Sequence, residues 1–529
     1  MKKIIGLVVI IAALVLGSYY GMGLVTERTL KKTIEVVNQS NGIFVDIERY
    51  DRNWFTSSAV LNWRLHVPER LIKGDNGQST TVPAKDYTLQ MPLVIYHGPV
   101  ILADGGVRFG LGYAHSDLGM PSAYADKFSN MFTSESIQPH LNVSLFVNYL
   151  NNTRLHIGVP SFKLIAKQGG DQFEWLGMET DLGVSSNLKK LDGNVEITGV
   201  SLKKNQMQVL LGKVNSDYDL HQTDAGIYLG EANLSLPSLV ATENTQKIVE
   251  VSEFALHSKS DIESGLFNSY FKTSVDKVMA QGKTYGPGLL EMSLKNLDAE
   301  ALADINQQAN RIQQGSDSER QQALIAMLPQ LPKLFGKGAQ FEISKLSFVL
   351  PQGAVEGNLL VSLPKGDTGN PFQLVQKVQG HATFKMPVEM VKNLVMVSVK
   401  QKLLSQSTVQ QAMIEQMKAN EAAQATAAPV PAEAATPATA PGAPAPASAT
   451  TQPADGGTTP PNDAPAAQPV MTVAEIEQQA TVQTTQKLAD LVSSGLLSMQ
   501  GTEYVIELNL TQGQLTVNGK PFSPSMMQF

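Results

Sequence analysis

The chain has 529 residues, of which 42% are hydrophobic and 17% are charged, with 48 acidic against 41 basic residues. This acidic balance argues against a nucleic-acid-binding protein, which would carry a basic excess, so no nucleic-acid partner is expected. The absence of cysteine excludes disulfide scaffolds, cysteine-ligated metal sites and thiol nucleophiles.

The first element is an apolar N-terminal segment, and residues 1–27 are predicted to form a transmembrane anchor. No charged residue occurs in the 22 positions from 4 to 25, and about 20 apolar residues span a bilayer as a helix. A cleaved signal peptide is one alternative, although Gly21-Met22-Gly23 is a poor cleavage site; a buried helix is another. Lys2 and Lys3 favour a cytoplasmic N-terminus. The expected location is the bacterial inner membrane, crossed once through residues 4–25, with the bulk of the chain in the periplasm.

Residues 28–260 are predicted to form a β-rich periplasmic domain. Alternate positions of one segment are apolar, namely Leu141, Val143, Leu145, Val147 and Tyr149. This period-2 pattern is typical of a half-buried antiparallel strand. Similar segments follow, separated by clusters of Asn, Gly and Asp that are typical of turns. Parallel sheets need long helical crossovers, and the pattern shows almost none, so we expect a long antiparallel meander.

A helical section is predicted over residues 261–336. Three segments there have apolar residues three and four positions apart, which is the spacing of one helix face. The first stripe consists of Leu266, Phe267, Tyr270, Phe271, Val275, Val278 and Met279. Gly286-Pro287-Gly288 then breaks the chain. Two further stripes cover residues 297–312 and 324–331.

The remaining chain divides into three segments. Residues 337–420 carry strand patterns followed by a helix that begins near Val388. Residues 421–471 are nearly all Ala, Pro, Thr, Gln and Gly. This composition cannot bury enough apolar surface to offset the entropy of ordering, so an Ala/Pro/Thr-rich disordered insert is predicted. Residues 472–529 are predicted to form a helix and a C-terminal β-hairpin with a turn near Gly513.

The predicted fold class follows from these elements. It is α+β and mostly antiparallel β, with an elongated meander sheet, a helical section, a single N-terminal transmembrane helix and a disordered insert. Such a sheet has one apolar side that must be covered. If the helices leave part of that side open, an apolar groove remains. Period-2 alternation alone does not distinguish a lined groove from a closed core.

The sequence contains few motifs with chemical meaning. There is no HExxH, GxSxG or GxxxxGK[ST] motif. Ser274 and Lys277 have the S-x-x-K spacing, which would place them on adjacent turns of a helix, but no KTG triad follows. The eight histidines include no pair four residues apart. No catalytic residue, metal ligand or cofactor is therefore predicted.

Four short motifs occur in order along the chain. They are YDRNWFTSS at 50–58, YHGP at 96–99, YGPG at 285–288 and LTVNGKP at 515–521. Together with the N-terminal segment, they resemble the YdgA-like family of bacterial envelope proteins, whose function is unknown. The resemblance implies an inner-membrane-anchored periplasmic protein with a largely β body, and it supplies no catalytic residue.

The motifs single out a set of residues that we expect to be structural. The set is Trp54, Phe55, His97, Gly98, Pro99, Tyr285, Gly286, Pro287, Gly288, Asn518 and Gly519. Gly98-Pro99 and Asn518-Gly519 are expected to form turns, and Trp54 with Phe55 to cover the core or a sheet edge.

The expected function is that of a non-enzymatic, membrane-anchored envelope protein with an apolar groove for lipid or for an exported chain. One alternative is a self-associating structural module, such as a homodimer. Another is a hydrolase whose site gathers distant residues. An uncovered apolar sheet face would favour the first class, a two-fold apolar interface the second, and a cleft gathering Ser, His and carboxylate side chains the third.

Overall fold

The computed structural model divides the chain into two units. One contains Met1–Met386 with Val505–Phe529, and the other contains Pro387–Tyr504. The predicted disordered insert lies outside the described residues from position 426 to its end. The structure describes residues 2–38, 43–67, 70–73, 79–187, 189–314, 317–366, 376–425 and 472–522.

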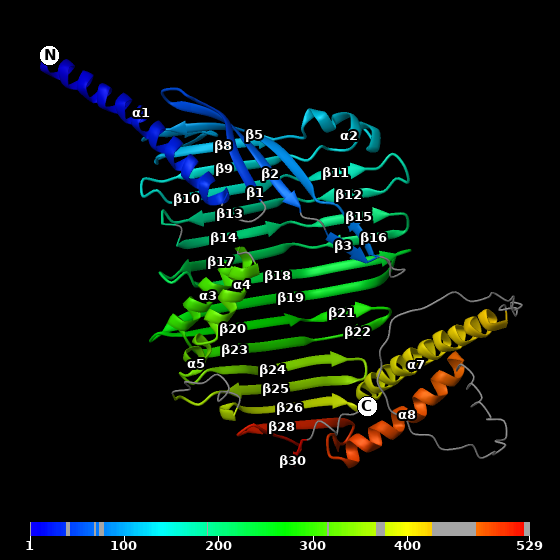
Figure 1. Ribbon diagram of the computed structural model, residues 1–529. Helices are drawn as coiled ribbons and strands as arrows, with labels where there is room; N and C mark the ends of the chain where they lie inside the picture. Colours follow the sequence, from blue (N-terminus) through cyan, green and yellow to red (C-terminus); the bar gives the residue numbers. More distant parts are fainter. Residues whose placement is uncertain are drawn as a thin grey trace, which may run out of the picture. The chain divides into compact units, whose positions relative to one another are not determined.

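The first unit is built on one large antiparallel sheet (Figure 1). Its principal strands pair in chain order, so the predicted meander is confirmed. They are β1 (Ile43–Arg52), β2 (Thr56–Val67), β5 (Lys85–His97), β8 (Gly112–Leu118), β9 (Leu141–Val147), β10 (Thr153–Val159), β13 (Met178–Val184), β14 (Lys190–Ile197), β17 (Val214–Gln222), β18 (Tyr228–Glu243), β19 (Gln246–Glu263), β20 (Leu266–Val275), β23 (Gly288–Asp298), β24 (Gln340–Leu350), β25 (Gly353–Ser362), β26 (Gln379–Pro387), β28 (Glu503–Thr511), β29 (Gln514–Val517) and β30 (Lys520–Pro521).

A second row of shorter strands extends the middle of the sheet. These are β11 (Phe162–Ile165), β12 (Gln172–Trp175), β15 (Val200–Lys204), β16 (Met207–Leu211), β21 (Lys277–Ala280) and β22 (Lys283–Tyr285). They join the principal row through the long strands β18 and β19, each of which pairs with strands of both rows. The smaller elements are β3 (Arg70–Lys73), β4 (Ser79–Val82), β6 (Ile101–Ala103), β7 (Gly106–Arg108), β27 (Ser498–Gln500), a 3-10 turn at Ser122–Tyr124 and α2 (Ala125–Met131).

A line of breaks separates the two rows. Hydrogen bonds connect the breaks of neighbouring strands: Leu176 N donates to Gly199 O over 3.0 Å, and Gly212 N donates to Ser238 O over 2.8 Å. Gly199 has φ of 153°, and a Cβ there would lie 2.8 Å from Leu211 O. The break line, as we call it, contains the interruptions at residues 160–161, 176–177, 198–199, 212–213, 276 and 286–287. It crosses the continuous strands β18 and β19 at Ser238 and Ser252, which accept hydrogen bonds from Gly212 N and Asp276 N.

The break line explains why the predicted first helix is wrong. Residues 266–298 form β20 to β23, and helix begins only at Ala299. Phe271, Thr273 and Val275 lie on the same face of β20. Because Thr273 is polar, the two apolar residues of this face are four positions apart. Val278 follows three positions later, across the break. An interrupted strand with polar residues on its apolar face thus imitates the spacing of a helix.

Three helices follow β23, and the second and third predicted stripes are confirmed as helices. Leu297, Ala301 and Leu334 are buried together, which packs the helices against one end of β20 and β23. Ala303 completes a second small core with Leu229 of β18. The helices are α3 (Ala299–Gln314), α4 (Asp317–Met327) and α5 (Gln330–Phe335).

The chain begins with α1 (Lys2–Asn38), so the β domain starts at Ile43 and not at residue 28. Leu30 and Ile34 of α1 pack on a core formed by β1, β2, β5 and β8. The Asn38 side chain ends this contact by pairing with the Val45 backbone, accepting from Val45 N over 2.6 Å.

The predicted transmembrane span lies in α1. Over the part of the chain that the structure describes, no helix is both long and apolar enough to cross a membrane. The side chains of residues 2–14, which make up much of the predicted span at 4–25, fall outside that part. The transmembrane helix is therefore not confirmed.

The second unit is a pair of helices, α7 (Val388–Ala425) and α8 (Val473–Ser493), close to the predicted helices. Val399 and Leu403 of α7 pack on Ile476 and Ala480 of α8. Thr472 caps α8 in a capping box, because its side chain accepts from Glu475 N while the Glu475 carboxylate accepts from Thr472 N.

Candidate functional site

One face of the sheet is apolar across most of its strands. Directly paired residues of neighbouring antiparallel strands share a face. One such row runs from Ile95 through Ala114, Leu145 and Leu155 to Leu182. Further along the sheet, a second row lies on the same face and consists of the successively paired residues Leu234, Leu256, Thr273, Leu290 and Leu346. Leu359 of the next strand also lies on this face. We call this side the apolar face.

The apolar face continues across the break line. Phe162 pairs with Trp175, which pairs with Val200, and the row extends to Leu211 and Leu239. Side chains alternate between the two faces along a strand, and each break inserts one extra residue. Residues three positions apart across a break, such as Val159 and Phe162, therefore lie on the same face. Val159 and Phe162, on either side of one break, line the same hollow.

The opposite face is polar and carries cross-strand ion pairs. Lys213 lies 2.8 Å from Glu196, Lys272 lies 3.1 Å from Glu291, and Arg154 lies 3.5 Å from Asp192. Lys295, 2.8 Å from Glu342, lowers the pKa of that carboxyl through a hydrogen bond. Charges that pair while remaining hydrated are typical of a solvent-facing sheet surface. The two faces therefore have opposite character.

The apolar face is not covered like an ordinary core. Among the described residues, no hydrophobic side chain between Val147 and Ile227 is buried, and none between Leu229 and Leu297. The apolar residues of β10 to β19 are instead mostly half-buried, including Leu155, Leu182 and Val195. An antiparallel sheet usually packs its apolar side on a second layer. The buried clusters of this face lie where α1 and α3 to α5 meet the sheet.

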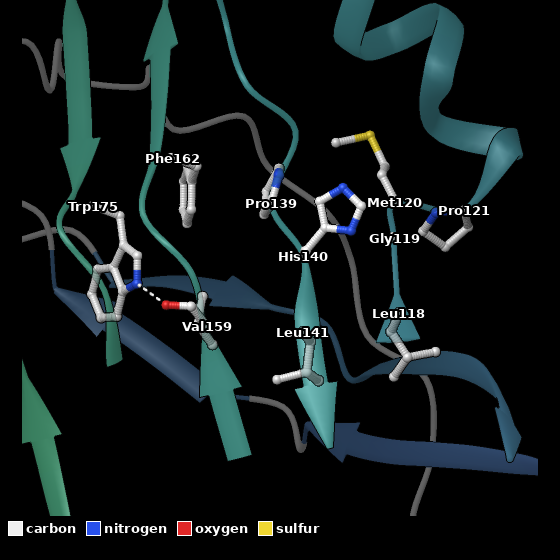
Figure 2. Close-up of a pocket in the computed structure, with 10 residues that line it drawn as sticks. All are labelled: Leu118, Gly119, Met120, Pro121, Pro139, His140, Leu141, Val159, Phe162 and Trp175. Atoms are coloured by element: carbon white, nitrogen blue, oxygen red, sulfur yellow. Dashed lines mark hydrogen bonds between the residues drawn. The ribbon is translucent and has the colours of Figure 1, made fainter. Parts of the chain in front are cut away.

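A hollow of about 530 Å³ opens on the apolar face at one end of β9 and β10 (Figure 2). Trp175 is held there by a hydrogen bond from its Nε1 to Val159 O, over 3.3 Å. The Phe162 ring stacks on Trp175 at 6.4 Å between centroids. The lining is almost wholly apolar and consists of Leu118, Gly119, Met120, Pro121, Pro139, His140, Leu141, Val159, Phe162 and Trp175. Phe162 and Trp175 were not predicted as site residues, because an interrupted alternation conceals that they share a face with Val159.

His97, Gly98 and Pro99 hold α1 against the sheet. His97 is 1% exposed; its Nδ1 donates to Tyr19 O over 3.1 Å, and Ser57 Oγ donates to its Nε2 over 3.2 Å. Burial lowers the pKa of His97 below the ordinary 6.5. Gly98 has φ of 129°, and a Cβ there would lie 2.0 Å from the Tyr19 ring. This part of the motif set is therefore a helix-docking joint.

Trp54 and Phe55 lie in the turn between β1 and β2, and each is more than half exposed. They do not belong to the core: Trp54 packs on Tyr20 at 5.5 Å between ring centroids, and Phe55 packs on Tyr19 at 5.0 Å. Of the two expected places, the core is therefore wrong, and both rings lie at the strand ends against α1.

Tyr285, Gly286, Pro287 and Gly288 lie at the break line. The Gly286–Pro287 bond is cis, and Gly286 N donates to Val349 O over 2.7 Å. Gly288 is buried under the Phe348 ring, which a Cβ would approach to 2.6 Å. These residues shape the sheet where its strands are interrupted.

Asn518 and Gly519 form the turn between β29 and β30, both with positive φ. The Asn518 side chain accepts from Glu507 N over 2.8 Å, which ties the turn to β28. The structure therefore places the motif residues in three separate regions and does not bring them together as one site.

The S-x-x-K spacing does not correspond to a helix in the structure. Ser274 and Lys277 lie on β20 and β21, so they are not on adjacent helix turns. No group of three His, Asp or Glu side chains suited to a metal ion occurs over the described residues.

The fold and its faces define a class of protein: a single two-faced antiparallel sheet whose apolar side, over the described residues, is buried most fully where helices meet it. The chain belongs to the family described as "Bacterial protein of unknown function (DUF945)", which matches residues 1–525. No curated protein and no solved structure matches it.

Proposed function

We propose that this protein is a non-enzymatic, membrane-anchored envelope protein whose apolar sheet face binds the acyl chains of lipids. One observation carries the proposal: the apolar face is continuous and half-exposed over β10 to β19, while the opposite face is polar and ion-paired. Soluble monomers rarely expose apolar patches beyond a few hundred Å² unless the patch binds something.

An acyl chain suits this face better than an exported polypeptide. The backbone groups of the middle strands already pair with neighbouring strands on both sides. A peptide lying across the face would therefore find few partners for its N–H and C=O groups, and burying such groups unpaired costs free energy. An acyl chain has no such groups, and each buried CH₂ contributes about 0.8 kcal/mol.

The proposed location is the bacterial inner membrane, with a single span through residues 4–25 and the bulk of the chain in the periplasm. The uncharged run at the N-terminus and the flanking Lys2 and Lys3 support this. The family description supports a bacterial source for the chain. Lipids are present at high concentration around such an anchor.

A pair of neighbouring substitutions tests the proposal. Val195 lies on the apolar face, and Asn194, the next residue, lies on the polar face opposite Asp181 and Asp217. The full chain is purified in detergent, and bound phospholipid per chain is counted by mass spectrometry. Val195→Lys should fold and carry less lipid, whereas Asn194→Lys should match the unaltered chain, because its new charge faces two carboxylates.

Two results would contradict the proposal. Equal lipid in the two variants would show that the face holds none. Unfolding of Val195→Lys alone would show that the face is a closed core, since a buried unpaired charge costs several kcal/mol. The competing hypothesis is a homodimer, in which a second copy of the chain covers the apolar face. This hypothesis predicts that Val195→Lys changes the sedimentation coefficient and leaves the lipid count unaltered.

A further inference from the structure

Three turns meet at the strand ends beside α1. They are the β1–β2 turn at 53–55, the β5–β8 connection at 98–111 and the β9–β10 turn at 148–152. Hydrogen bonds join them: His97 N donates to Phe55 O over 3.2 Å, Leu111 N donates to Val147 O over 2.8 Å, and the Tyr149 hydroxyl donates to Pro99 O. The three turns therefore form one continuous surface.

This surface presents large apolar side chains to solvent. Their exposed fractions lie between 51% for Phe55 and 75% for Leu150. We call the set the collar; its members are Trp54, Phe55, Leu102, Val107, Phe109 and Leu150.

Part of the collar and the neighbouring Val100 contact α1 at one level of the helix. The Tyr19 hydroxyl donates to Val100 O over 2.7 Å, and the Tyr19 and Tyr20 rings pack on Phe55 and Trp54. From this level α1 continues as one helix to Lys2, through a sequence without charge from Ile4 onward. At 1.5 Å per residue, the 15 residues before Tyr19 span about 23 Å, comparable to a bilayer core of about 30 Å.

We propose that the collar docks on the lipid bilayer, inserting its aromatic and aliphatic side chains at the headgroup boundary around the point where α1 enters. This rests on the proposed function, because it requires α1 to be the membrane anchor. A helix inserted up to Tyr19 brings the collar to the interface, where Trp, Tyr and Phe side chains are favoured. The bilayer is therefore the proposed partner of the collar, because the helix beside the collar is the proposed membrane anchor.

The charges near the collar do not oppose this docking. Arg52 pairs with Glu27 at 2.9 Å and lies over the Tyr20 ring at 4.9 Å. Arg108 lies over the Tyr113 ring at 4.2 Å, and the Tyr113 hydroxyl donates to Asp104. Each charged group therefore has a partner within the protein, and docking leaves none of them unpaired.

Docking also brings the apolar face to the bilayer. The turn at 148–152 belongs to the collar and joins β9 to β10, where the half-exposed part of the apolar face begins. An acyl chain leaving the membrane at this turn would pass along α1, whose Thr29 and Leu30 line a hollow with Leu145, to reach Leu155 on the neighbouring strand. The collar would thus be the side through which lipid reaches the sheet.

Tryptophan fluorescence tests the proposal, because the chain contains only Trp54, Trp63 and Trp175. In the Trp63→Phe/Trp175→Phe variant, Trp54 is the sole reporter. The full chain is reconstituted in phospholipid vesicles with and without brominated acyl chains. Trp54 should emit at shorter wavelength than in water and lose about half of its intensity to bromine, as expected for a ring at the interface.

The matched control is Trp54→Phe/Trp175→Phe, which leaves Trp63 as reporter on β2, packed on the core beneath α1. Its emission should be unchanged by bromine. Trp54 emission typical of water and unchanged by bromine, in protein that floats with vesicles, would overturn the collar and leave the anchor standing. Protein that does not float would overturn both. Quenching of Trp54 together with an unchanged lipid count in Val195→Lys would keep the collar and reject the proposed function.

Discussion

The same row of the sheet is covered at one end and open at the other. In the N-terminal region, Ile95 and its neighbours Ala59 and Leu93 are buried in a core on which Leu30 and Ile34 of α1 pack. Along the same row, Leu155 and Leu182 remain half-exposed. The alternation of residues is alike in both regions. What differs is the presence of a covering helix, so a core and a binding face can share one sequence pattern.

This comparison predicts a large difference between two aspartate substitutions. Leu93→Asp places an unpaired charge under α1 and should reduce the free energy of unfolding by about 3–5 kcal/mol or more. Leu182→Asp places the same charge on the open region, where water reaches it, and should cost about 1 kcal/mol. Urea denaturation of the full chain in detergent measures both. Equal losses would mean that the middle of the sheet is also a closed core.

A second prediction concerns the joint that holds α1. Gly98→Ala should cost more than about 3 kcal/mol, because its Cβ overlaps the Tyr19 ring in addition to the strain of positive φ. Gly105→Ala, at φ of 69° with open space around it, is the control and should cost about 1–2 kcal/mol. Thermal unfolding compares the two. Matching melting temperatures would show that α1 contributes little to covering the N-terminal region.

The covered region should also respond to acid through His97. Its folded pKa is below the unfolded value of 6.5, so the unfolded chain binds more protons below pH 6.5. Stability contributed by neutral His97 is complete above pH 6.5 and falls as the pH is lowered, by at most about 1.4 kcal/mol per pH unit. His97→Gln should remove this slope. Denaturation midpoints from pH 7.5 to 5 measure it; a slope unchanged in the variant would assign the effect to other groups.

The smallest effect is expected on the polar face. Lys295→Met removes the partner of Glu342 and should cost about 0–1 kcal/mol, since exposed ion pairs contribute little. High salt should reduce the difference further. Denaturation in low and high salt checks both points. A loss above 2 kcal/mol would show that this face is buried against something else.

The meander, the helices after Leu297 and the C-terminal hairpin could be predicted from the sequence, because each has a clear local pattern. Residues 266–279 were wrongly predicted to be helical, because the break at Asp276 and the polar Ser269 and Thr273 change the spacing of the apolar residues. Whether the apolar face is open cannot be read from local patterns, since the α1 residues that pack on the sheet are more than 100 positions away from Leu155. Phe162 and Trp175 were not predicted as site residues, because a break also interrupts their alternation with Val159.

The central claim, that the middle of the sheet is an open face holding acyl chains, is tested most directly by crosslinking within the shared face. A diazirine analogue of leucine is placed at Leu182 or at Leu93, so that size and polarity are preserved. The cells are illuminated, and adducts on the full chain are identified by mass spectrometry. We predict phospholipid adducts at position 182 and none at 93, because α1 covers the latter. Absence of lipid at 182, or equal labelling at both positions, would contradict the account.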